Sequence, residues 1–129
     1  MAHWRRARPA WSMPDMHDTR DIKQQERIIA LYEAMSGATS AMLAAARAED
    51  WDVLVTLEAT CAAHVAALQR DEALTALSAE QNDQKAALIT QMLADDGELR
   101  RLIAARMTQL SNEMNSAHTE RKLSRAYGA

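Results

Sequence analysis

The stretch LITQMLADDGELRRLIAARMTQLSNEM, residues 88–114, decides the fold class of this chain. Its apolar side chains recur every three or four residues, which is the spacing of one face of an α-helix. The stripe consists of Leu88, Met92, Asp96, Leu99, Ile103, Met107, Leu110 and Met114. The apolar phase is kept across Asp95–Gly97, so we expect one continuous helix. It should begin near residue 79, because Ser78 and Gln81 have the spacing of a capping box.

Two further helices are expected before this stretch, near residues 21–48 and 51–73. The second of them follows Asp50, a residue type that caps helix N-termini well. Between Val53 and Gln69 its only charged side chain is Glu58, so this helix is apolar on nearly every side. A bundle of three or four helices can hardly enclose one helix completely. We therefore expect part of this apolar surface to bind a partner.

The composition agrees with a helical bundle. Among 129 residues there are 3 Gly, 2 Pro and no Phe, so the turn and aromatic residues that sheets need are scarce. We predict an all-α fold, an antiparallel three-helix bundle with a short C-terminal fourth helix after Ser116, where the apolar stripe stops. Residues 1–20 hold both prolines and no helical period, so we predict a disordered extension there. Residues 21–129 should form one helical domain.

Charge and cysteine content exclude several classes of protein. The net charge is −3, and an acidic surface binds nucleic acid poorly because phosphates require Lys and Arg contacts. No run of apolar residues reaches the length of a membrane span. The single cysteine, Cys61, cannot form an internal disulfide and suits a reducing compartment. We therefore expect a cytoplasmic protein.

No arrangement of residues points to catalysis or to a bound metal. Cys61 and His64 share a helical face, but neither an orienting group nor an oxyanion site accompanies them. The other three histidines are scattered and no second cysteine is present, so a zinc site is not expected. Asp95 and Asp96 point about 100° apart on a helix, so they do not face each other as a catalytic pair. We expect no enzyme activity, no cofactor and no metal.

Three segments resemble flagellar export chaperones of the FliT type. They are AEDWDVL at residues 48–54, LADDGELRRLI at residues 93–103 and LSRAYG at residues 123–128. Their order and spacing carry the resemblance, which covers residues 22–128. Glu49 stands where the family usually has glycine before Asp-Trp. If this position requires a left-handed backbone, glutamate costs about 1 kcal/mol there.

The resemblance implies a chaperone that binds the C-terminal helix of the filament-cap protein, FliD, keeps it soluble and delivers it to the type III export gate. It implies contact with the export ATPase complex, a last helix that folds over the client groove and, in some members, restraint of the flagellar master transcription activator. Export-gate docking would use Leu123 and Tyr127. The client-binding groove would include Leu54, Leu57, Cys61, Leu88, Met92, Leu99 and Ile103.

Two alternatives stay open at this point. A generic helical scaffold or dimerisation protein would bury the second helix in a fixed homodimer. A regulator that binds the flagellar master transcription activator would share the non-enzymatic, cytoplasmic character. Co-purification with the cap protein would separate both alternatives from a chaperone.

Overall fold

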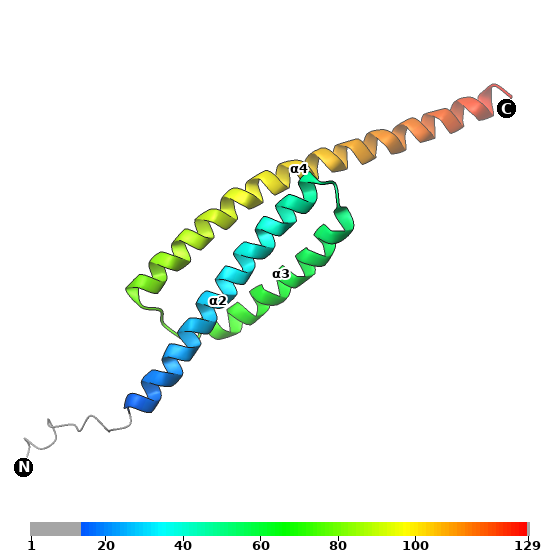
Figure 1. Cartoon of the computed structure of the whole chain (residues 1–129). Helices are drawn as coiled ribbons and strands as arrows, with labels where there is room; N and C mark the ends of the chain where they lie inside the picture. The colour runs from blue at the N-terminus through cyan, green and yellow to red at the C-terminus, as the bar shows by residue number, and fades with distance from the viewer. Residues whose placement is uncertain (1–13, 129) are drawn as a thin grey trace, which may run out of the picture.

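The helix α2 (Pro14–Arg47) is the centre of the fold, with α3 (Trp51–Glu72) and α4 (Ala79–Ala126) on its two flanks (Figure 1). The computed structural model describes the backbone of residues 14–128 and the side chains of residues 19–128. Across this part of the chain α2 packs against both other helices, whereas no Cα atom of α3 comes within 8 Å of one in α4. The described residues are all-helical apart from the connecting turns.

The first helix begins at Pro14, and not near residue 21 as the sequence predicted. A proline is favoured at the first position of a helix, because its missing N–H would have no intrahelical partner there. Residues 14–20, which the sequence placed in a disordered extension, are helical in this structure. The rest of the predicted extension, residues 1–13, lies outside the described residues.

Two clusters of buried side chains hold α2 against its neighbours. The Met42 cluster consists of Met42, Leu43, Ala45, Ala46, Leu54 and Leu99. The Ile28 cluster consists of Ile28, Tyr32 and Leu68. Among the described residues, α3 contributes only Leu54 and Leu68 to the buried apolar core, and α4 contributes only Leu99. Because α2 supplies the rest, the two flanking helices are each covered on one side only.

The turn from α2 to α3 places Trp51 at the start of α3. Glu49 has a φ of 58°, the left-handed conformation that a non-glycine residue adopts at a cost of about 1–2 kcal/mol. The Asp50 side chain then accepts a hydrogen bond of 3.4 Å from the backbone N–H of Val53 and caps α3, as predicted. The position that resembles the family's glycine is thus left-handed in this chain.

The helix α4 runs without a break over 48 residues, about 72 Å at the usual helical rise. Its capping box at Ser78 and Gln81 and its continuity through Gly97 confirm the sequence prediction. The predicted separate fourth helix is wrong, because α4 continues through Asn115 and Ser116 to Ala126. Neither residue breaks a helix, since each costs only a fraction of a kcal/mol, below about 0.7, relative to alanine.

The last part of α4 extends beyond the other two helices (Figure 1). Every residue from 111 to 128 is exposed. We call residues 111–126 the overhang. Its helix has no tertiary packing along its length, which makes it the least supported segment of the described chain.

Two helices are apolar enough, by length and composition, to be compared with membrane spans. They are Thr19–Arg47 of α2 and the whole of α3. Length and composition alone are weak grounds for a span, since the core helix of a soluble protein passes the same test. The apolar window of α2 is 44% buried inside the protein, as in such a core helix, whereas that of α3 is only 11% buried. The apolar surface of α3 is therefore uncovered in this structure.

Candidate functional site

A groove of about 320 Å³ lies between α3 and α4, near the base of the overhang. It is lined by Trp51, Leu54, Val55, Glu58, Ile103, Arg106, Met107 and Leu110. Six of these eight side chains are apolar. Val55 is 61% exposed and Met107 is 62% exposed, so a partner can reach both. We call this site the α3–α4 groove.

The groove is open because α2 ends beside it. Arg47, the last residue of α2, donates hydrogen bonds of 2.7 and 3.1 Å from Nη2 and Nε to Oε1 of Glu98. The end of α2 is thereby fixed alongside this turn of α4. Side chains further along α4, such as Met107 and Leu110, continue the same apolar stripe without α2 to cover them.

The same contact shifts the titration of both partners. The hydrogen bond from Arg47 is the main reason why the pKa of Glu98 lies below its usual value. The hydrogen bond to Glu98 likewise raises the pKa of Arg47. Both groups are therefore charged at neutral pH, and their exposed ion pair joins the end of α2 to α4.

A contact between Trp51 and Arg106 bridges α3 and α4. The guanidinium carbon of Arg106 lies 5.8 Å from the centroid of the Trp51 ring, within the range of a cation–π interaction. Both residues also line a second hollow of about 200 Å³, on the side of the α2–α3 turn. The Trp51–Arg106 contact therefore separates the α3–α4 groove from this smaller hollow.

At the opposite end of α3, three side chains tie all three helices together. The Tyr32 hydroxyl donates a hydrogen bond of 2.5 Å to Oε2 of Glu72, and Nζ of Lys85 donates one of 2.5 Å to Oε1 of the same carboxylate. Lys85 also lies 5.3 Å from the centroid of the Tyr32 ring. We call these three residues the clamp. It fixes this end of α3 to both α2 and α4.

The electrostatics of the clamp follow from its contacts. Partial burial pushes the pKa of Glu72 upward, but the hydrogen bonds from Lys85 and Tyr32 outweigh it and leave this pKa below its usual value. The hydrogen bond to Glu72 raises the pKa of Lys85. Burial, followed by the hydrogen bond to Glu72, raises the pKa of Tyr32. The clamp therefore consists of a carboxylate, an ammonium and a neutral phenol at neutral pH.

The structure places the predicted client-groove residues at different depths. Leu54 and Leu99 are buried in the Met42 cluster, and Leu54 also lines the α3–α4 groove. Leu57 and Cys61 are half-buried and pack against the Met42 cluster. Leu88 and Met92 are also half-buried and pack against the Ile28 cluster. Ile103 alone among the seven predicted residues is exposed, at 36%, and it lines the groove.

Several groove residues were not among the predicted ones. They are Trp51, Val55, Glu58, Arg106, Met107 and Leu110. Met107 and Leu110 belong to the apolar stripe of α4, so a sequence signal existed for both. No sequence signal indicated Arg106, because its role depends on the approach of Trp51 from another helix.

The residues predicted to dock on the export gate lie at the far end of the overhang. Leu123 is 52% exposed and Tyr127 is 84% exposed. The backbone N–H of Tyr127 donates a hydrogen bond of 2.9 Å to the Leu123 carbonyl and ends the helix. The expected fold-back of a separate last helix over the groove is not seen, because the tail continues α4 away from the other two helices (Figure 1).

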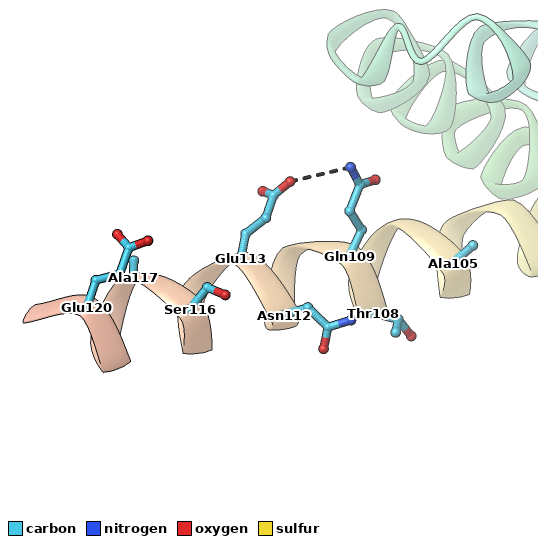
Figure 2. A pocket seen from close by; sticks show the side chains of 8 residues that line it. All are labelled: Ala105, Thr108, Gln109, Asn112, Glu113, Ser116, Ala117 and Glu120. Carbon is cyan, nitrogen blue, oxygen red and sulfur yellow. Dashed lines mark hydrogen bonds between the residues drawn. The ribbon is translucent and has the colours of Figure 1, made fainter. Parts of the chain in front are cut away.

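A hollow of about 600 Å³ on the outer part of α4 is not a ligand pocket. All its lining residues come from α4, as Figure 2 shows, and they include Gln109 and Glu113, joined by a 3.4 Å hydrogen bond. A hollow bordered by one helix is an open face. Among the residues whose side chains are described, no group of three or more His, Cys, Asp or Glu could hold a metal ion.

The chain is similar in sequence to known flagellar proteins. Residues 29–129 match the sequence profile of the family described as "Flagellar protein FliT". The chain is 28% identical over 110 residues to the "Flagellar protein FliT" of Serratia proteamaculans (strain 568). That alignment covers 83% of this chain and 88% of the relative. No solved structure matches the chain.

Proposed function

The chain belongs to the FliT family of flagellar proteins, and from this membership we propose that it is an export chaperone for the filament-cap protein, FliD. In this proposal it binds the C-terminal helix of the cap protein in the cytoplasm and keeps it soluble. It then delivers this client to the type III export gate. It acts by binding alone and catalyses no reaction.

The observation that carries the proposal is the uncovered apolar surface of α3. Only Leu54 and Leu68 of its 22 residues are buried. Val55 lines the α3–α4 groove. Val53, whose side chain is 45% exposed, lies two residues before it in the sequence. An apolar surface of this kind on a soluble protein marks an interaction site.

An amphipathic helix is the client that fits this surface best. The backbones of α3 and α4 do not approach each other, so the groove can receive a helix between their side chains. Such a helix would present anchors at positions i, i+3, i+4 and i+7. Full burial of an apolar side chain such as Val55 or Met107 contributes about 1.5–3 kcal/mol. Glu58 and Arg106 at the groove favour a client with complementary charges.

We assign the predicted groove residues different roles within this proposal. Ile103 contacts the client directly. Leu54 and Leu99 support the groove from the core, because little of their surface is exposed. The half-buried residues contribute only where a client reaches the edge of the core clusters; they are Leu57, Cys61, Leu88 and Met92.

Delivery is proposed to use the far end of the overhang. Leu123 and Tyr127 are exposed there, well separated in sequence from the groove, so a loaded chaperone can still present them to the export gate. Contact with the export ATPase complex belongs to the same proposal. Binding of the flagellar master transcription activator remains the alternative role, as does a fixed homodimer formed through α3.

The test compares one groove variant on each of α3 and α4 with a control variant on α4. Val55→Asp and Met107→Asp should each weaken binding of a peptide with the cap protein's C-terminal sequence by about 30-fold or more, since a carboxylate would be buried against apolar anchors. Leu93→Asp changes an apolar residue of α4 that is 67% exposed and does not line the groove. It should leave the affinity within about twofold, a change of less than 0.5 kcal/mol.

Isothermal titration calorimetry measures these affinities, and circular dichroism confirms that each variant is helical. Equal affinities for the groove variants and the control would refute the proposed groove. A concentration-dependent dimer that buries Val55 and excludes the peptide would favour the homodimer instead.

A further inference from the structure

One face of the overhang carries basic side chains without acidic neighbours. His118, Arg121, Lys122 and Arg125 lie together on an open face of α4 near its end. Their spacing of three, four and seven residues places them on one side of the helix. All four are exposed, and no residue three or four positions away from any of them is acidic. We call these four residues the basic face.

The fold itself gives no reason for this arrangement. Along the described chain, none of the four takes part in any of the ion pairs that the helices form. Like charges one turn apart destabilise a helix, and the helix dipole favours cations only in its last turn. The dipole therefore accounts for Arg125 in the last turn, but not for Arg121 and Lys122, which lie before it. The overhang also lacks tertiary packing that could offset the repulsion.

The charge of the basic face differs from that of the rest of the helical region. Residues 117–129 contain three Lys or Arg and one acid, Glu120. Residues 21–116 contain eight Lys or Arg and fifteen Asp or Glu. The overhang therefore ends in a positive patch that follows an acidic helical region, and a negatively charged partner would meet attraction at this patch.

We infer that the basic face docks on an acidic surface of another protein, different from the client in the groove. Arg121, Lys122 and Arg125 would pair with carboxylates that follow a helical or extended spacing on the partner. This contact relieves the repulsion within the overhang and orders a helix that otherwise has no support. It is independent of the α3–α4 groove, so it does not depend on which client the groove holds.

A membrane surface fits the same face less well. On a helix, Leu123 and Tyr127 point away from the basic face, and Glu120 lies on their side. A helix that binds at a membrane interface needs a broad apolar face opposite its cations. Here that side has two large apolar residues and a carboxylate. Nucleic acid fits less well because three Lys or Arg residues neutralise few phosphates, and such a face would bind it only weakly at physiological salt.

A second copy of this chain is also a poor partner. Docking the basic face of one copy on the acidic body of another is a head-to-tail contact. Such contacts continue from copy to copy and form open chains unless a rotation closes them. A separate acidic protein needs no such closure, and it leaves the groove of each copy free.

The experiment uses the full chain and a fluorescent poly-L-glutamate of about 20 residues, with binding followed by anisotropy at low salt. The triple variant Arg121→Gln, Lys122→Gln and Arg125→Gln should bind at least about tenfold more weakly than the natural chain. Raising the salt to about 0.3 M should abolish the difference, because exposed charges are then strongly screened. Glutamine keeps helix propensity close to that of arginine and lysine, so the variant should remain helical.

A matched variant removes three exposed cations elsewhere, by Arg20→Gln, Lys23→Gln and Arg70→Gln. Its affinity for the probe should stay within about twofold of that of the natural chain, whereas a tenfold loss of affinity corresponds to about 1.4 kcal/mol. An equal loss in both triple variants would overturn the inference. Tighter binding to vesicles of phosphatidylserine and phosphatidylcholine, or to duplex DNA, than to poly-L-glutamate would also overturn it. Salt-sensitive formation of oligomers by the chain alone would identify a second copy as the partner and would overturn it as well.

Discussion

The guanidinium of Arg106 lies 5.8 Å from the ring centroid of Trp51 and joins α4 to the start of α3 across the α3–α4 groove. The backbones of the two helices do not approach each other, so side chains alone set the width of the groove. Trp51 also packs against the Met42 cluster and is thereby anchored to α2. The contact thus connects the core to the proposed client site.

The energy of this contact can be measured with a double-mutant cycle. Arg106→Gln should lower the free energy of unfolding by about 0.5–1 kcal/mol, the usual value of a partly exposed cation–π pair. Trp51→Leu should cost more, because it also removes packing on the Met42 cluster. Urea denaturation of both single variants and the double variant gives the coupling energy. Strictly additive effects would mean that the two side chains do not interact.

Glu49 provides a test of the turn between α2 and α3. Its φ of 58° is unfavourable for glutamate, so Glu49→Gly should stabilise the protein by about 0.5–1 kcal/mol. Glu33→Gly, at an exposed position within α2, should instead destabilise it by about 1 kcal/mol. Thermal unfolding of the two variants side by side shows the sign of each change. A loss of stability in Glu49→Gly would contradict the left-handed geometry of this turn.

The clamp predicts a specific dependence of stability on pH. The pKa of Glu72 is lowered in the folded protein from its usual value of 4.5, so its contribution is complete above about pH 4.5. This contribution is lost as the pH falls through the lower, folded pKa. The raised pKa values of Tyr32 and Lys85 affect stability at alkaline pH. Their contribution is lost as the pH rises above about 10.

Denaturation between pH 3 and pH 7 tests the acidic half of this prediction. Glu72→Gln should show a smaller loss of stability on acidification than the natural chain, because the group that gains a proton is absent. Glu26→Gln changes an exposed acid on α2 and should keep the natural profile. Identical profiles for all three proteins would show that the clamp does not contribute.

The extended overhang predicts what its removal does. None of residues 111–128 is buried, so a chain that ends at Met114 should lose helical signal but change its melting temperature by no more than about 2 °C. Its affinity for the cap-protein peptide should stay the same, since the groove remains intact. A large fall in melting temperature would mean that the tail packs against the bundle in solution.

The sequence predicted those parts of the fold that local signals determine. Asp50 caps α3, and Ser78 with Gln81 starts α4, because a cap needs only residues within one turn of each other. The end of α4 was predicted wrongly for a physical reason. Loss of the apolar stripe after Met114 signals loss of packing and not loss of helix, and the overhang is a helix without packing.

The groove was only partly predictable for a related reason. Leu99 and Met107 belong to one apolar stripe of α4, yet Leu99 is 5% exposed and Met107 is 62% exposed. The difference arises because Arg47 ends α2 beside Glu98, which leaves the stripe uncovered further on. Periodicity identifies an apolar face, but only the length of the neighbouring helix decides which part of that face is core and which part can bind a client.

The central claim, that the cap protein's C-terminal helix lies in the α3–α4 groove, is tested most directly by site-specific photo-crosslinking. A photoreactive residue is placed at Val55, at Met107 or at the control position Leu93, and the full chain is irradiated with the cap protein. The account predicts crosslinks from positions 55 and 107 to the C-terminal segment of the cap protein, and none from position 93. Crosslinks from position 93 alone, or none from positions 55 and 107 while the complex is intact, would contradict it.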